Sequence, residues 1–141
     1  MKIQTFDTSK KIFLIAEIGN NHEGSFSLAK KLILLAKKNG ADAVKFQYIK
    51  PEKLVHPNTE AKRIKTLKLF CLSLDQFKKL RQYSIKIGII FLSSVFDIDE
   101  IKLFSKILPA FKVASGDNDN IYYIKKLIEY KKPILISMGM K

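Results

Sequence analysis

The amino-acid sequence predicts an α/β fold built on a parallel sheet, and two observations support this prediction. Short apolar runs alternate with amphipathic segments of helical period, and the alternation is regular along the 141 residues. Strands and helices that alternate in this way form a parallel sheet with right-handed crossovers. The length fits one domain, and 47% hydrophobic with 28% charged residues is typical of a globular chain rather than a disordered or membrane-spanning one.

The expected strands are short apolar runs of the kind found in sheets that are covered on both faces. They are Ile12–Glu17, Ala43–Gln47, Ile87–Leu92, Ala110–Ala114 and Ile134–Ser137. The first expected helix, Phe26–Lys38, has Ser25 as its N-cap and Asn39-Gly40 as its stop signal. The other expected helices are Leu74–Lys86, Ile98–Ile107 and Asn120–Tyr130.

One connection interrupts this rhythm. The segment Tyr48–Ser73 is long, contains Pro51 and Pro57, and holds only a modest helical pattern near Glu60–Leu69. Long loops in compact domains are commonly lids or binding loops, so we expect this one to lie near a functional site.

The composition excludes several classes of protein. The single cysteine, Cys71, excludes an internal disulfide framework and a cysteine-rich metal site, which suits a reducing compartment. Lys10 and Lys11 precede an apolar stretch, Ile12–Ala16, that is too short for a secretory signal and ends at a carboxylate. We therefore expect a cytoplasmic protein with no membrane partner.

The net charge of +13 has three interpretations. It reflects a compositional preference for lysine, an attraction for small anionic substrates, or a nucleic-acid surface. Arg63 and Arg81 are the only arginines, whereas base readout and bidentate phosphate recognition favour arginine. A nucleic-acid partner is therefore the interpretation we expect least.

Polar side chains follow every expected strand. The segment Leu14–Ser25 reads L-I-A-E-I-G-N-N-H-E-G-S. It contains the end of the first expected strand, where Glu17 ends the apolar run, and the polar turn that follows. By itself this segment is compatible with an ordinary surface turn. In a parallel α/β fold, however, functional residues gather at the carboxyl ends of the strands. The later strand ends add Ser93, Ser94 and Ser137.

Two lysines lie inside expected strands. Ala43, Lys45 and Gln47 are every second residue of their strand, so their side chains share one side of it. Lys112 lies in the fourth expected strand. One such lysine is commonly a surface residue whose amine reaches solvent. Two of them, with the hydroxyls of Ser94 and Ser115, indicate a pocket for a phosphate or carboxylate.

Four motifs occur in order along the chain: A-E-I-G-N-N-H-E-G-S, K-F-Q, F-L-S-S-V-F-D and K-V-A-S-G-D-N. Together they resemble the N-terminal half of the sialic acid synthases, and the likeness runs from about Ile12 to Met140. This family includes N-acetylneuraminate, legionaminate, pseudaminate and spore-coat polysaccharide synthases. The resemblance implies a (β/α)8 barrel that condenses phosphoenolpyruvate with an N-acylated amino-sugar aldehyde. The products are a nine-carbon 2-keto acid and phosphate.

The resemblance also implies roles for individual residues. Glu17 matches the carboxylate that meets the sugar, Asp117 is the candidate proton-transfer carboxylate, and Asn21 and His22 shape the mouth of the site. The residues that match the phosphoenolpyruvate-binding set are Lys45, Gln47, Ser94, Lys112 and Ser115. The family motif Ser-Thr-Pro-Phe is Ser93-Ser94-Val95-Phe96 here, without the proline that stiffens the loop.

Length is the larger departure from the family, because a (β/α)8 barrel takes about 250 residues. We expect residues 1–141 to supply about five strands, with the first and fifth as open edges that favour self-association. In the family, the last barrel strands, the Mn²⁺- or Mg²⁺-binding histidines and a small antifreeze-like domain belong to the C-terminal half, which residues 1–141 do not match. We therefore expect no metal ligand within these residues. Three interpretations remain: a fragment or split half of a synthase that needs a separate chain, a non-catalytic anion-binding relic, or an unrelated nucleic-acid-associated protein.

Overall fold

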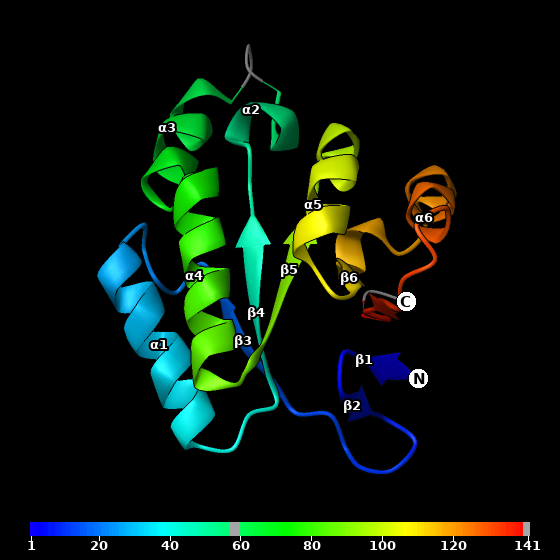
Figure 1. Cartoon of the computed structure of the whole chain (residues 1–141). Helices are drawn as coiled ribbons and strands as arrows, with labels where there is room; N and C mark the ends of the chain where they lie inside the picture. Colours follow the sequence, from blue (N-terminus) through cyan, green and yellow to red (C-terminus); the bar gives the residue numbers. More distant parts are fainter. Residues whose placement is uncertain (57–59, 140–141) are drawn as a thin grey trace.

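A parallel sheet of five strands forms the centre of the computed structural model, which describes residues 1–56 and 60–139 (Figure 1). The strands are β3 (Ile15–Gly19), β4 (Ala43–Tyr48), β5 (Ile90–Val95), β6 (Phe111–Val113) and β7 (Ile134–Ile136). Their order in the sheet follows their order in the chain. Each crossover therefore adds the next strand on the same side, as in a β/α barrel, and the predicted parallel α/β fold is confirmed.

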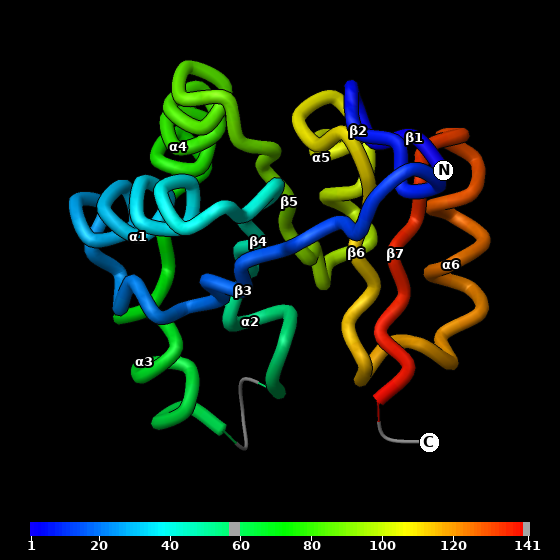
Figure 2. The backbone as a smooth tube through the Cα atoms, turned by 90° about the horizontal axis from the view of Figure 1, so that it is seen from below, coloured from blue at the N-terminus to red at the C-terminus, as the bar shows by residue number. Residues whose placement is uncertain are grey.

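Helices cover one face of this sheet. The four that connect consecutive strands are α1 (Phe26–Lys38), α4 (Leu74–Ile87), α5 (Ile101–Ile107) and α6 (Ile121–Ile128), and they lie around the outside of the strands (Figure 2). The connection after β4 also holds two further helices, α2 (Pro51–Leu54) and α3 (Ala61–Leu69). None of the helices in the described part of the chain combines the length and the apolarity of a membrane span.

Side chains on the helix-covered face form the larger core. Val44 and Phe46 of β4 point to this face, as does Phe91 of β5, and the rings of Phe46 and Phe91 stack with centroids 5.2 Å apart. Phe77 of α4 and Phe104 of α5 complete an aromatic cluster between sheet and helices. Burial of these large rings anchors the helices to the strands.

A hairpin covers the opposite, inner face near the amino ends of the strands. It consists of β1 (Lys2–Ile3) and β2 (Phe6–Asp7), which pair antiparallel. Buried side chains of the hairpin pack against the amino-terminal halves of the strands, namely Ile3 and Phe6 against Ala43, Ile90, Leu92 and Ala110. The inner face is therefore apolar at the amino ends, and the sequence interpretation above did not include this hairpin.

Several element boundaries differ from the expected ones. The strand expected at Ile87–Leu92 begins at Ile90, because α4 continues through Ile87 and ends at Gly88, whose φ of +72° is left-handed. The strand expected from Ile12 begins at Ile15. The helix expected from Ile98 begins with a 3₁₀ turn before α5. Pro57 and Met140 lie outside the described residues.

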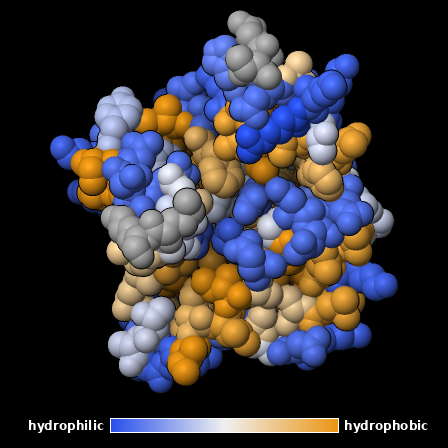
Figure 3. All heavy atoms as spheres, turned by 180° about the vertical axis from the view of Figure 1, so that it is seen from behind, coloured by the Kyte–Doolittle hydropathy of each residue, from blue (hydrophilic) through white to orange (hydrophobic). Residues whose placement is uncertain are grey.

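The outermost strands, β3 and β7, each have one neighbouring strand within residues 1–56 and 60–139. Apolar side chains near both strands are exposed: Leu14 is 53% exposed next to β3, and Ile136 of β7 is 42% exposed. Seen from the side opposite to Figure 1, hydrophobic residues gather in the lower middle of the surface (Figure 3). These edges are the open strand edges that the sequence led us to expect.

Candidate functional site

The sheet register brings polar side chains together on the inner face, near the carboxyl ends of the strands. Glu17 of β3 is paired with Lys45 of β4, Gln47 of β4 with Ser94 of β5, and Ser94 with Lys112 of β6. These residues alternate along their strands with residues that face the helices, so all five share the inner face. The site residues predicted on β3, β4, β5 and β6 are therefore neighbours in the structure.

Lys45 is held by Glu17. Its Nζ lies 2.9 Å from Oε1 and 2.8 Å from Oε2 of that carboxylate. The side chain of Lys45 is 6% exposed, whereas that of Glu17 is 56% exposed. A buried ammonium is strongly destabilising without a partner, and Glu17 is the only carboxylate paired with it in the described part of the chain.

Lys112 has a different environment, because no carboxylate is paired with it among residues 1–56 and 60–139. Its Nζ donates hydrogen bonds to the Val113 carbonyl at 2.6 Å and to Ser137 Oγ at 2.5 Å. Burial lowers the pKa of Lys112 below its ordinary value, the nearby Lys45 ammonium lowers it further, and Glu17 opposes both effects. An anion bound beside Lys112 would offset both unfavourable effects on its charge.

Two hydroxyls complete this cluster. Ser94 Oγ is buried and has no hydrogen-bond partner within the described residues, although buried hydroxyls are almost always paired. Ser137, just after β7, contacts Lys112 and was recognised in the sequence only as a polar strand end, without a role. A lysine flanked by two such hydroxyls is an arrangement that suits a phosphate. Asn20 Nδ2 donates to Gln47 Oε1 at 3.1 Å and orients that amide at the rim.

The turn after β6 carries Ser115 and Asp117, in a 3₁₀ turn over Ser115–Asp117. Burial raises the pKa of Asp117 above its ordinary value, and the negative charge of Asp119 raises it further. In the described residues Asp117 forms no hydrogen bond or ion pair with the lysines. Asn118 donates from Nδ2 to the Ser137 carbonyl at 3.1 Å and so ties this turn to the end of β7. The roles of Ser115 and Asp117 remain predictions.

Asn21 and His22 lie in the turn after β3. Asn21 is exposed, whereas His22 is 1% exposed and its ring lies 5.8 Å from that of Phe46, on the helix-covered side. Its Nδ1 accepts a hydrogen bond from the Gly24 N–H at 3.1 Å, and burial lowers its pKa. His22 therefore holds the shape of the turn from inside the core, and its side chain does not lie with those of Lys45 and Lys112.

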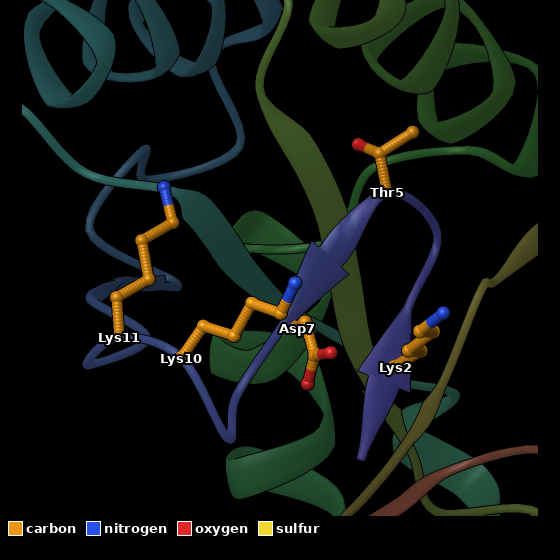
Figure 4. Close-up of a pocket in the computed structure, with 5 residues that line it drawn as sticks. All are labelled: Lys2, Thr5, Asp7, Lys10 and Lys11. Atoms are coloured by element: carbon orange, nitrogen blue, oxygen red, sulfur yellow. The ribbon is translucent and has the colours of Figure 1, made fainter.

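A cavity of about 380 Å³ lies beside the hairpin, toward the amino ends of the strands (Figure 4). Its lining residues are Lys2, Thr5, Asp7, Lys10 and Lys11, and all but Asp7 are exposed. This cavity lacks the buried polar groups found at the carboxyl ends, which we therefore regard as the candidate site. No group of three His, Cys, Asp or Glu side chains that could hold a metal ion occurs in the described residues, so they do not fit a divalent cation by themselves.

Comparisons with known proteins show which family this chain resembles. The NeuB family model matches residues 32–141. The chain is 36% identical to the N,N'-diacetyllegionaminic acid synthase of Campylobacter jejuni, covering 93% of this chain and 43% of that enzyme. It is 38% identical to the mouse N-acetylneuraminate-9-phosphate synthase, covering 92% of this chain and 39% of that enzyme.

Among solved structures, the N-acetylneuraminic acid synthetase of Leptospira borgpetersenii superposes with a TM-score of 0.84 at 28% identity, covering 92% of this chain and 45% of that chain. The sequence thus spans less than half the length of these relatives. Its five parallel strands and the helices between them follow the same course as in that synthetase, which confirms the predicted fold class. The chain belongs to the NeuB family.

Proposed function

We propose that the inner face of this chain binds phosphoenolpyruvate for a NeuB-type condensation with an N-acylated amino-sugar aldehyde. The observation that carries the proposal is the pair of inner-face lysines on β4 and β6. They flank the Ser94 hydroxyl of β5, which has no hydrogen-bond partner among residues 1–56 and 60–139. Phosphoenolpyruvate carries a phosphate and a carboxylate on a three-carbon frame. Two fixed cations on one face, with hydroxyls between them, match this pair of anions.

The two ends of phosphoenolpyruvate have different partners in this proposal. The phosphate lies against Lys112, which has no carboxylate partner in the described residues, with Ser94 and Ser137 as hydroxyl donors. The carboxylate lies toward Lys45 and the Gln47 amide. The proposal requires that C3 points away from the sheet, toward the second substrate.

The reaction forms one carbon–carbon bond and releases phosphate. C3 of phosphoenolpyruvate attacks the aldehyde carbon, the aldehyde oxygen takes up a proton, water adds at C2, and the C2–O bond to phosphate breaks. Glu17, more than half exposed, is positioned to accept a hydrogen bond from the sugar. The raised pKa of Asp117 favours its protonated form to a higher pH than usual, which suits a proton donor. The Mn²⁺ or Mg²⁺ that the family resemblance implies needs ligands beyond the described residues, and no step is assigned to it.

Binding is tested by isothermal titration calorimetry with phosphoenolpyruvate. Replacing Lys112 by Met removes the cation proposed for the phosphate and should weaken binding by about 2–5 kcal/mol, or roughly thirty- to five-thousand-fold. The matched control is Lys125→Met, on an exposed lysine of α6 that forms no ion pair in the described part of the chain. Equal affinities of wild type and Lys112→Met would refute the proposed site.

Turnover is tested separately by phosphate release from phosphoenolpyruvate with N-acetylmannosamine and Mn²⁺. A (β/α)8 barrel has eight strands, and the described residues supply five of them. We therefore propose that phosphate release requires a polypeptide that supplies the remaining strands, whereas phosphoenolpyruvate binding does not. Phosphate release by residues 1–141 alone would contradict this separation.

A further inference from the structure

The two inner-face lysines differ in whether their charge is already neutralised. Lys45 is 6% exposed and is held by both carboxylate oxygens of Glu17. Lys112 donates only to a carbonyl and a hydroxyl, with no carboxylate paired to it in the described residues. A ligand with two anionic groups therefore meets one available cation and one cation that already has an anion.

We propose that Glu17 is an internal competing anion, which the carboxylate of phosphoenolpyruvate displaces from Lys45. The inference rests on the proposed function. In this exchange the phosphate binds first at Lys112, and the substrate carboxylate then replaces Glu17 at Lys45. Glu17 thereby becomes the group that moves, while Lys45 stays in place.

Burial supports this assignment of the mobile partner. The Lys45 ammonium lies inside the sheet, and leaving its pocket unpaired would be strongly unfavourable. The Glu17 carboxylate is 56% exposed, so water can solvate it when it leaves the ion pair. Two carboxylates on one buried ammonium would repel each other in a medium of low dielectric constant, which favours exchange over shared binding.

The backbone around Glu17 also allows the direction of its side chain to change. Glu17 lies on β3, an edge of the described sheet, and the β3–β4 register shifts between Glu17 and Gly19. Such irregularities re-aim a side chain relative to the regular pleat and are frequent next to active sites. Glu17 Oε1 lies 3.4 Å from the position that a Cβ on Gly19 would occupy, so a glycine at this position leaves space beside the carboxylate.

The exchange has a consequence for the order of binding. While Glu17 is paired with Lys45, its oxygens are engaged and are poor acceptors for a sugar hydroxyl. Once phosphoenolpyruvate has displaced it, Glu17 is free to accept that hydrogen bond. Binding of phosphoenolpyruvate should therefore strengthen sugar binding, and the reciprocal effect follows from linkage.

Calorimetry with phosphoenolpyruvate tests the exchange in Glu17→Gln, which keeps the side-chain shape and removes the charge. We expect a Kd at least tenfold lower than that of wild type, equivalent to ~1.4 kcal/mol, because no carboxylate competes for Lys45. Glu23→Gln is the matched control. It removes the same charge from an exposed residue of the next turn that forms no ion pair in the described residues, and it should change the affinity less than threefold.

The outcomes separate this inference from the proposed function. If wild type binds phosphoenolpyruvate as tightly as Glu17→Gln or more tightly, the exchange is refuted while the binding site stands. If neither protein binds phosphoenolpyruvate, the proposed function itself fails. If Glu23→Gln raises the affinity for phosphoenolpyruvate as much as Glu17→Gln does, the gain comes from the lower negative charge of the protein as a whole, and the exchange is refuted.

Glu17→Gln leaves the Lys45 ammonium without its anion, so the variant is expected to be less stable than wild type. Phosphoenolpyruvate should then raise the melting temperature of the variant more than that of wild type, since it restores an anion at Lys45. A second measurement uses wild type alone. The carboxyl ¹³C resonance of Glu17 should move on saturation with phosphoenolpyruvate, and an unchanged resonance would refute displacement even if the variant does not fold.

Discussion

The turn after β3 is held against the end of α3 at one glycine. Gly24 has a φ of +76°, and a Cβ placed on it would lie 2.1 Å from the Leu69 carbonyl oxygen and 3.2 Å from the Leu69 carbonyl carbon. Both atoms belong to the backbone and cannot rotate away. Gly24→Ala therefore forces the turn and the end of α3 apart.

The free energy of this change has two sources. A non-glycine residue in the left-handed region is less stable by roughly 1–2 kcal/mol. Separation of the turn also weakens the hydrogen bond from the Gly24 N–H to the buried His22 ring, and an unpaired buried group destabilises by about 1–3 kcal/mol. We expect Gly24→Ala to lower the free energy of unfolding by about 2–5 kcal/mol, a large share of the 5–15 kcal/mol typical of a domain.

Gly88→Ala is the matched control, because the φ of Gly88, +72°, is close to that of Gly24. The nearest atom to a Cβ on Gly88 is the flexible Lys37 Nζ, at 3.9 Å. Only the conformational contribution remains there, so a loss of about 1–2 kcal/mol is expected. Urea unfolding followed by circular dichroism measures both variants against wild type. If Gly24→Ala destabilises no more than Gly88→Ala, the close approach to Leu69 does not constrain the turn.

Three further predictions follow from the same structure. Burial lowers the pKa of His22 below its ordinary value of 6.5, so His22 takes up a proton at higher pH in the unfolded chain than in the folded one. The free energy of unfolding should therefore fall as the pH drops below 6.5. His22→Gln should reduce this pH dependence in urea titrations, and His56→Gln, at an exposed histidine, is the control. Asp117→Asn, in a preparation that contains the rest of the barrel, should lower phosphate release at least about a hundredfold while phosphoenolpyruvate still binds; loss of binding at unchanged turnover would reverse the assignment. The open strand edges should cause residues 1–141 to self-associate, which gel filtration would detect, and Ile136→Lys should weaken this association. A protein that elutes as a monomer at every concentration would contradict this prediction.

Local sequence signals were sufficient for most of the secondary structure. Ser25 accepts a hydrogen bond from the Leu28 N–H at 3.2 Å, as its position before the first apolar repeat predicted. The predicted start of β5 was wrong because Ile87 before Gly88 is as apolar as Ile89 and Ile90 after it. Periodicity alone did not show that Ile87 ends a helix, although Gly88 is a typical helix stop. The hairpin escaped notice because strands of two residues carry no periodic pattern.

The sequence predicted the strand residues of the candidate site but not the position of His22. Strand alternation placed Lys45 and Gln47 on one side of their strand, because side chains along a strand alternate with a period of two. Lys112 and Ser94 were grouped with them because they lie near the ends of other expected strands. His22 was expected at the mouth of the site by its place in the motif. Its burial beside Phe46 depends on how the turn folds back over the sheet, which residue order does not state.

Periodicity, capping and strand alternation are local properties of the chain, and they were enough to predict the parallel α/β architecture and a cluster of lysines at the strand ends. Which of these lysines is neutralised and which is available depends on contacts between residues far apart in the chain. The ion pair between Glu17 and Lys45 joins residues 28 positions apart, and the contact between Lys112 and Ser137 joins residues 25 positions apart. Both depend on the register between neighbouring parallel strands, which packing of the intervening helices sets.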